Sequence, residues 1–221
     1  MESIVKKLIE NKDFNGLREL LADNSGLANE DITIPYDVKC KVKGHPLHRL
    51  CDAVFAGKMT EDEAIILAEI FLEYGADIDG GKNGGTPLLA AASLHAEKLG
   101  IFYIGKGADV NLTDEIDNAS ALHWAAFCGR DKLVAKLINS KASIDECDKT
   151  YQCTPLGWAI ENLMSNDKGN KHNQVACIKL FLQSGANIKK LSARANEYLH
   201  FLGENDPEIN SILKTIPKIK K

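Results

Sequence analysis

Short segments with helical spacing of apolar residues alternate along the chain with segments rich in turn formers. The segments come in pairs: the first has a small apolar face, as at Leu88 and Ala92, and the second a bulkier one, as at Leu133 and Leu137. A Thr or Ser precedes most first segments, where its hydroxyl can accept a hydrogen bond from the first unpaired amides of a helix. The pattern therefore predicts an all-α chain built from pairs of short helices.

The pairs recur at a fixed distance. Helix starts at Thr86, Ser120 and Thr154 follow one another every 34 positions. Gly107 and Gly185 follow the second segment of their pairs, where a left-handed residue commonly ends a helix. Lys141 stands at the equivalent place in the intervening pair, and a lysine with positive φ costs about 1 kcal/mol. We expect that turn either to take another form or to be strained.

Four units share a helix-start phrase and a turn phrase that together resemble those of ankyrin repeats. The units read Gly44-His45-Pro46-Leu47-His48 with Tyr74-Gly75-Ala76-Asp77-Ile78-Asp79, Gly85-Thr86-Pro87-Leu88 with Lys106-Gly107-Ala108-Asp109-Val110-Asn111, Ser120-Ala121-Leu122-His123-Trp124-Ala125-Ala126 with Lys141-Ala142-Ser143-Ile144-Asp145, and Thr154-Pro155-Leu156-Gly157-Trp158-Ala159 with Ser184-Gly185-Ala186-Asn187-Ile188. The resemblance implies an ankyrin repeat solenoid of stacked helix-turn-helix pairs with β-hairpin tips. It also implies that the chain binds other proteins, because such repeats bind far more often than they catalyse.

A stack of helix pairs needs end units with a more polar outer side, and both ends of the chain offer candidates. We expect a single elongated domain over residues 1–221. Its parts are N-terminal capping helices at 1–30, an extended arm at 31–43, ankyrin repeats at 44–83, 84–117, 118–151 and 152–190, C-terminal capping helices at 191–215, and a basic tail at 216–221. The arm is expected to be extended because apolar and polar residues alternate from Ile32 to Val42.

Two repeats carry an insertion between their helices, at 57–63 and 165–173. In the first, Thr60 and Glu63 fit a capping box that opens a helix from Ala64 to Tyr74. The second is polar and turn-rich, which predicts a mobile loop.

Ligands of ankyrin repeats usually meet the concave side, made of hairpin tips and the exposed residues of each first helix. At the positions of this chain that match those parts of the family, several residues are aromatic or apolar, whereas ordinary protein surface there is polar. Tryptophan and tyrosine often contribute most of the binding energy at protein–protein interfaces. The candidates for partner binding are Leu94, Ile116, Trp124, Phe127, Tyr151, Trp158 and Glu161. A structural role for the two tryptophans, packed against the next helix, is the alternative interpretation.

Charge and cysteine content narrow the classes of partner. A formal net charge of -4 lacks the broad basic surface that binding to a phosphate backbone needs, so we expect no nucleic acid partner. Acidic residues at the predicted hairpins favour a basic partner. The six cysteines form no C-x-x-C pair and the N-terminus has no long apolar segment, which fits a cytoplasmic protein without a membrane partner.

No group of residues has the spacing of a catalytic or metal site, and we expect no cofactor. His48 and His123 occupy the Leu-His position of the family phrase, where the imidazole braces neighbouring turns. We therefore expect a monomeric, non-enzymatic module that binds an unidentified protein partner through the concave face. One alternative is an inhibitor or immunity-type subunit that blocks a partner enzyme with the arm at 31–43 and the loop at 165–173. Another is an enzyme with its site on an appended domain, for which little chain remains.

Overall fold

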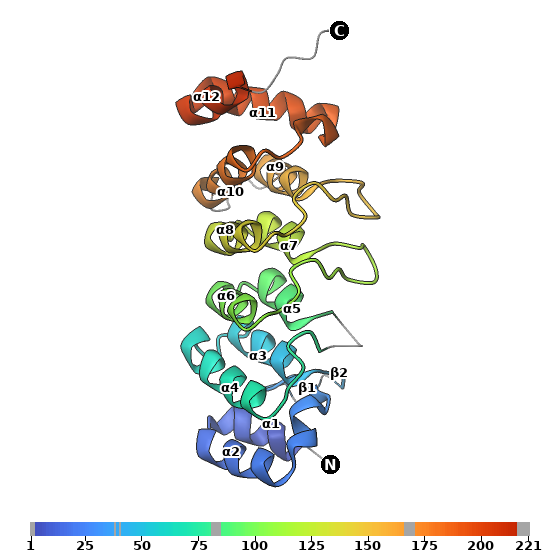
Figure 1. Cartoon of the computed structure of the whole chain (residues 1–221), viewed down its shortest axis with the longest axis vertical. Helices are drawn as coiled ribbons and strands as arrows, with labels where there is room; N and C mark the ends of the chain where they lie inside the picture. Colours follow the sequence, from blue (N-terminus) through green and yellow to red (C-terminus); the bar gives the residue numbers. More distant parts are fainter. Residues whose placement is uncertain (1–2, 38, 40, 81–84, 166–170, 216–221) are drawn as a thin grey trace. The chain divides into compact units, whose positions relative to one another are not determined.

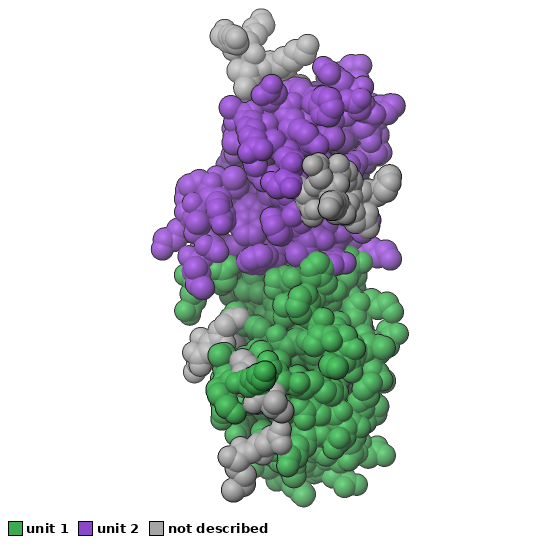
Figure 2. Space-filling model, turned by 180° about the vertical axis from the view of Figure 1, so that it is seen from behind, with its two compact units in different colours: residues 1–115 green, residues 116–221 purple. Residues whose placement is uncertain are grey.

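The computed structural model describes residues 3–37, 39, 41–80, 85–165 and 171–215 (Figure 1). Within these residues the chain forms twelve α-helices, two short 3-10 helices and one pair of strands, as the all-α prediction expects. The chain divides into two compact units, unit 1 at residues 1–115 and unit 2 at residues 116–221 (Figure 2). That the whole chain is one elongated domain stays a prediction.

Unit 1 contains three consecutive helix pairs, in which α1 packs on α2, α3 on α4 and α5 on α6 (Figure 1). Neighbouring pairs are joined because α2 contacts α4, α4 contacts α6 and α3 contacts α5. The elements are α1 (Ile4–Asn11), α2 (Phe14–Asp23), η1 (Ser25–Asn29), β1 (Ile32–Thr33), β2 (Lys43–Gly44), α3 (Pro46–Phe55), α4 (Glu61–Glu73), α5 (Pro87–Ser93) and α6 (Glu97–Gly105). The core of the unit is aliphatic, with Phe71 and Tyr103 as its largest buried side chains.

Near its two ends, the arm at 31–43 forms two short strands that pair with each other. β1 and β2 are antiparallel, with Ile32 opposite Gly44, which confirms the extended prediction there, while Val38 and Cys40 lie outside the described residues. Ile32 is buried. Between the strands, the Tyr36 hydroxyl donates to the main-chain oxygen of Glu10 at 3.0 Å. The described part of the arm is thus held against α1.

Unit 2 also contains three helix pairs, α7 with α8, α9 with α10 and α11 with α12 (Figure 1). The first helices form one row, in which α7 contacts α9 and α9 contacts α11, and the second helices form another, from α8 to α10 to α12. The elements are α7 (Ala121–Phe127), α8 (Asp131–Asn139), α9 (Pro155–Ser165), α10 (Lys171–Gln183), η2 (Ile188–Lys190), α11 (Ala193–Asn205) and α12 (Pro207–Thr215).

The helices begin where their capping residues predict. The Thr86 hydroxyl oxygen accepts from the Leu89 amide at 3.2 Å, and that of Thr154 from the Gly157 amide at 3.3 Å. At the start of α4, the Thr60 hydroxyl accepts from the amide of Glu63 and the Glu63 carboxylate accepts from the amide of Thr60. The predicted capping box is confirmed, and it satisfies amides that have no partner inside the helix. The helix itself begins at Glu61, directly after its cap, and not at Ala64 as predicted.

The turns after the second helices use left-handed backbone. Gly107 and Gly185 have φ of 98° and 81°, and Lys141 has φ of 69°. The sequence left two options for Lys141, and the turn takes the strained one, because a side chain at positive φ crowds its own backbone.

The helices that follow the two insertions are longer than the second helices of the other repeats. α4 and α10 each have 13 residues, against 9 in α6 and α8. The predicted loop at 165–173 was therefore wrong at both ends: α9 runs through Ser165, α10 begins at Lys171, and residues 166–170 lie outside the described residues. Early in α10, buried Gln174 donates to the Phe127 carbonyl and, at 3.0 Å, to Asn162 Oδ1. Contacts of this kind stabilise a helix that the polar sequence does not predict.

Candidate functional site

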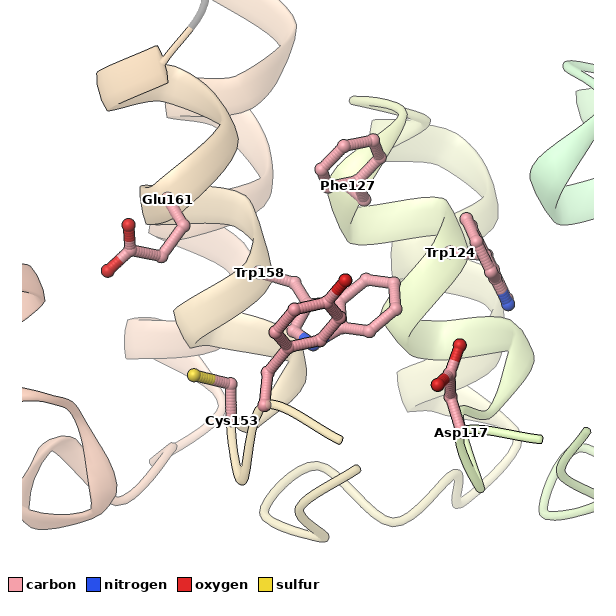
Figure 3. Close-up of a pocket in the computed structure, with 7 residues that line it drawn as sticks. Asp117, Trp124, Phe127, Cys153, Trp158 and Glu161 are labelled. Atoms are coloured by element: carbon pink, nitrogen blue, oxygen red, sulfur yellow. The ribbon is translucent and has the colours of Figure 1, made fainter. Parts of the chain in front are cut away.

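A pocket of about 470 Å³ opens on unit 2, where α7, α9 and their preceding loops meet (Figure 3). Its lining is mainly aromatic, with a carboxylate at each of two positions. The lining residues are Asp117, Trp124, Phe127, Tyr151, Cys153, Trp158 and Glu161.

Helical spacing places four of these side chains on facing helices. Trp124 and Phe127 lie three residues apart on α7, and Trp158 and Glu161 have the same spacing on α9. Residues three apart lie on nearly the same face of a helix, and each helix contributes two side chains to the lining of the pocket. Figure 3 shows Phe127 and Trp158 between the two helices and Glu161 on the side of α9 that faces away from α7. Tyr151 comes from the turn that precedes α9.

Trp158 is the centre of the aromatic group. Its ring centroid lies 5.2 Å from that of Trp124, 5.8 Å from Phe127 and 6.0 Å from Tyr151. All three pairs are close to perpendicular, with interplanar angles between 76° and 84°, and edge-to-face contacts of this kind are favourable. The three surrounding rings therefore stabilise the position of Trp158 through these contacts.

Exposure separates the floor of the pocket from its rim. Trp158 is only 7% exposed, Trp124 is half-buried, and Phe127 and Tyr151 are 40% and 67% exposed. Trp158 is packed in the structure, as the structural interpretation expects, and it also forms the base of a surface pocket. That the tryptophans bind a partner stays a prediction. Phe127 and Tyr151 are the most exposed aromatic side chains of the lining.

The loop before α9 is organised around the fully buried carboxylate of Asp148. Its oxygens accept from the Tyr151 amide at 2.5 Å, from the Cys153 amide at 2.9 Å and from the indole Nε1 of Trp158 at 3.0 Å. Burial by itself raises the pKa of Asp148, but hydrogen bonds from Tyr151, Trp158 and Cys153 outweigh it and lower the pKa. This carboxylate fixes both the turn that carries Tyr151 and the orientation of Trp158.

The histidines of the helix-start phrases brace turns, as the sequence predicts. In His123, Nδ1 accepts from the Ser120 amide at 3.1 Å, so the protonated Nε2 donates to the Cys153 carbonyl at 3.2 Å. In His48, Nδ1 donates to the Gly85 carbonyl at 3.3 Å. His123 thereby ties the start of α7 to the loop that precedes α9.

Asp117 and Glu161 supply the charge of the pocket. The Asp117 carboxylate accepts from the Thr150 hydroxyl at 2.5 Å. Glu161 accepts from the Ser192 hydroxyl at 3.5 Å and lies 3.9 Å from the exposed guanidinium of Arg194. Both pairings of Glu161 are long, and the lining residues include neither lysine nor arginine. The pocket is aromatic with acidic margins.

The structure brings five of the seven predicted binding residues together, namely Trp124, Phe127, Tyr151, Trp158 and Glu161. Ile116 belongs to the same unit and is 81% exposed but is not one of the lining residues. Leu94 belongs to unit 1, where it is half-buried at the end of α5.

Asp117 and Cys153 line the pocket but were not among the predicted site residues. Asp117 falls within the predicted hairpin tip before α7, so its position there was the available signal. Cys153 faces the pocket because the hydrogen bonds to Asp148 and His123 fold its loop, and no local pattern encodes that arrangement. Burial, followed by nearby Asp148, raises the pKa of the Cys153 thiol, which disfavours the nucleophilic thiolate.

Two further properties concern only the described residues. They contain no group of three or more His, Cys, Asp or Glu side chains placed to hold a metal ion. Among them, no helix combines the length and apolar character needed to cross a bilayer.

Residues 95–192 match the family model described as ankyrin repeats, in three copies. Among curated proteins, the chain is similar to palmitoyltransferase ZDHHC13 of Mus musculus, with 31% identity over 110 residues, and to that of Homo sapiens, with 30% over 110 residues. Each match covers 48% of this chain, which spans only 16% of the length of those relatives.

Proposed function

The chain carries ankyrin repeats over residues 95–192, and from that premise we propose that it is a non-enzymatic recognition module for a protein partner. Ankyrin repeats generally mediate protein–protein interaction and are typically non-enzymatic. The partner binds on the face of unit 2 that holds the aromatic pocket. We assign this face to the concave side of an ankyrin stack because first helices and their preceding loops form it.

The observation that carries this proposal is the exposed aromatic rim of the pocket. Phe127 and Tyr151 present large apolar surface to solvent above the buried ring of Trp158. Residues that dominate binding energy are enriched in Trp and Tyr, and they cluster in pockets from which a partner expels water. The hydrogen bonds of Asp148 fix the side chain of Trp158 and the backbone turn that carries Tyr151, which reduces the entropy lost on binding.

The inhibitor alternative relied on the arm at 31–43 and the insertion at 165–173. The described part of that arm contacts α1 of its own unit through Tyr36, which supports a structural role for it. Most of the second insertion lies outside the described residues. No observation favours inhibition over recognition. A monomeric state, a cytoplasmic location and the absence of nucleic acid and membrane partners remain proposals.

The test is affinity capture from the source cytosol with three forms of the full chain as bait: wild type, the double variant Phe127→Glu with Tyr151→Glu, and the control Phe201→Glu. Phe201 suits the control because it is 54% exposed on α11 and does not line the pocket. Circular dichroism first establishes that all three baits fold. We expect one protein to be retained by wild type and by the control but not by the double variant. Equal retention by all three baits contradicts the proposal.

A further inference from the structure

We propose that the aromatic pocket binds an arginine side chain of the partner, held between the rings and the two carboxylates. This inference rests on the proposed function and specifies the chemistry that the pocket recognises. It concerns the lining residues of unit 2 alone.

The rings provide the first part of the argument. A cation is attracted to an aromatic face when it lies within about 6 Å of the ring centroid. The rings of Trp124, Phe127 and Tyr151 all lie within 6.0 Å of Trp158, centroid to centroid, so the pocket gathers four aromatic rings in one place. Because those rings stand nearly perpendicular to Trp158, they offer faces in more than one direction.

The carboxylates provide the second part. Asp117 comes from the loop before α7 and Glu161 from α9, so carboxylates from two elements line the pocket. In Figure 3 Glu161 extends from the side of α9 that faces away from α7, and its carboxylate therefore lies at the margin of the pocket. No lining residue carries a positive charge. An apolar side chain in this place removes water from both carboxylates without replacing their hydrogen bonds, and that desolvation is unfavourable. A cationic side chain can form a cation–π contact with the rings and an ion pair with a carboxylate.

The preference for arginine over lysine follows from shape. A guanidinium is planar, stacks on aromatic rings and can donate two parallel hydrogen bonds to a carboxylate, whereas an ammonium is compact and strongly hydrated. The chain itself pairs Glu161 with the guanidinium of Arg194, at 3.9 Å and at the surface. A partner arginine that binds the same carboxylate can also stack on a ring of the pocket.

The chain offers a direct probe of the pocket, because its only two tryptophans, Trp124 and Trp158, both line it. In the two-dimensional 1H-15N NMR spectrum of the full-length protein, the two indole N–H signals report on the pocket alone. The probes are the blocked amino acids N-acetyl-arginine, N-acetyl-lysine, N-acetyl-citrulline and N-acetyl-leucine, each as its methylamide. Citrulline is the matched control, because it nearly preserves the shape of arginine and removes its charge.

We expect arginine to shift both indole signals saturably, lysine to do so more weakly, and citrulline and leucine to have little effect. The double variant Asp117→Asn with Glu161→Gln is expected to weaken arginine binding by roughly fivefold or more. The control Glu204→Gln changes an exposed carboxylate that does not line the pocket, and it is expected to leave binding unchanged.

Three results overturn the inference: citrulline or leucine binding as tightly as arginine, no response to arginine, or unchanged arginine binding in the double variant. If leucine binds and arginine does not, the pocket is apolar in its preference, and the proposed recognition function survives. Recognition itself is tested separately by the capture experiment, so the two failures are distinguishable.

Discussion

Replacing Asp148 by alanine removes a fully buried carboxylate and leaves three N–H groups without their acceptor. The donors are the amides of Tyr151 and Cys153 and the indole of Trp158, at 2.5, 2.9 and 3.0 Å. Hydrogen bonds to a charged group contribute about 1.5–3 kcal/mol each. Because the three share one acceptor and are not additive, we expect the free energy of unfolding to fall by about 3–5 kcal/mol.

The assay is urea unfolding followed by tryptophan fluorescence, which reports on unit 2 because both tryptophans lie there. The matched control is Asp23→Ala, which removes an exposed carboxylate at the end of α2 and is expected to change stability by less than about 0.5 kcal/mol. A loss below about 1 kcal/mol for Asp148→Ala refutes the argument that this carboxylate organises the loop.

The same residue predicts a pH dependence. The pKa of Asp148 in the folded protein lies below its ordinary value of 3.8, so the unfolded chain takes up a proton first as the pH falls. Its contribution is therefore complete well above pH 3.8 and is lost as the pH falls toward and through the folded pKa. We expect the stability difference between wild type and Asp148→Ala to be constant near neutral pH and to shrink below about pH 4. A difference that grows on acidification contradicts the assignment.

The other predictions concern one turn of unit 2 and two side chains in the core of unit 1. Lys141→Gly relieves a residue at φ 69° and is expected to stabilise unit 2 by about 0.5–1 kcal/mol in the same urea assay, whereas destabilisation means that the lysine makes compensating contacts. Tyr103→Phe removes the hydroxyl that donates to the Leu47 carbonyl at 2.8 Å, and we expect a loss of about 1 kcal/mol in unfolding followed by circular dichroism; no loss argues against that hydrogen bond. Cys51 is fully buried and burial raises its pKa, so iodoacetamide is expected to label it only after unfolding, as mass spectrometry of the peptides can show; labelling in the native protein contradicts the packing.

The features that the sequence predicts best depend on neighbouring residues. A hydroxyl at Thr86 or Thr154 caps the helix that follows it, and the box of Thr60 and Glu63 opens α4, because donor and acceptor lie within one turn. The repeat period then predicts which of these helices pair. Local chemistry therefore predicts the positions of most helices and the all-α class of the fold.

The features that escaped prediction depend on tertiary contacts. The polar residues at 165 and 171–173 favour a loop, yet they extend α9 and α10, and buried Gln174 bonds to Phe127 and Asn162. Cys153 joins the pocket lining through the hydrogen-bond network of Asp148 and His123. These partners are separated along the chain, so neither periodicity nor capping patterns reveal them.

The most direct test of the central claim is photocrosslinking from the pocket in the source cells. The photoreactive amino acid p-benzoylphenylalanine replaces Tyr151 at the rim of the pocket, or Phe201 as the control, since both positions are exposed and aromatic. The account predicts a crosslink to one protein from position 151 that is absent from position 201. Crosslinks from position 201 alone, equal crosslinks from both positions, or none from position 151 contradict the claim that this pocket is the recognition surface.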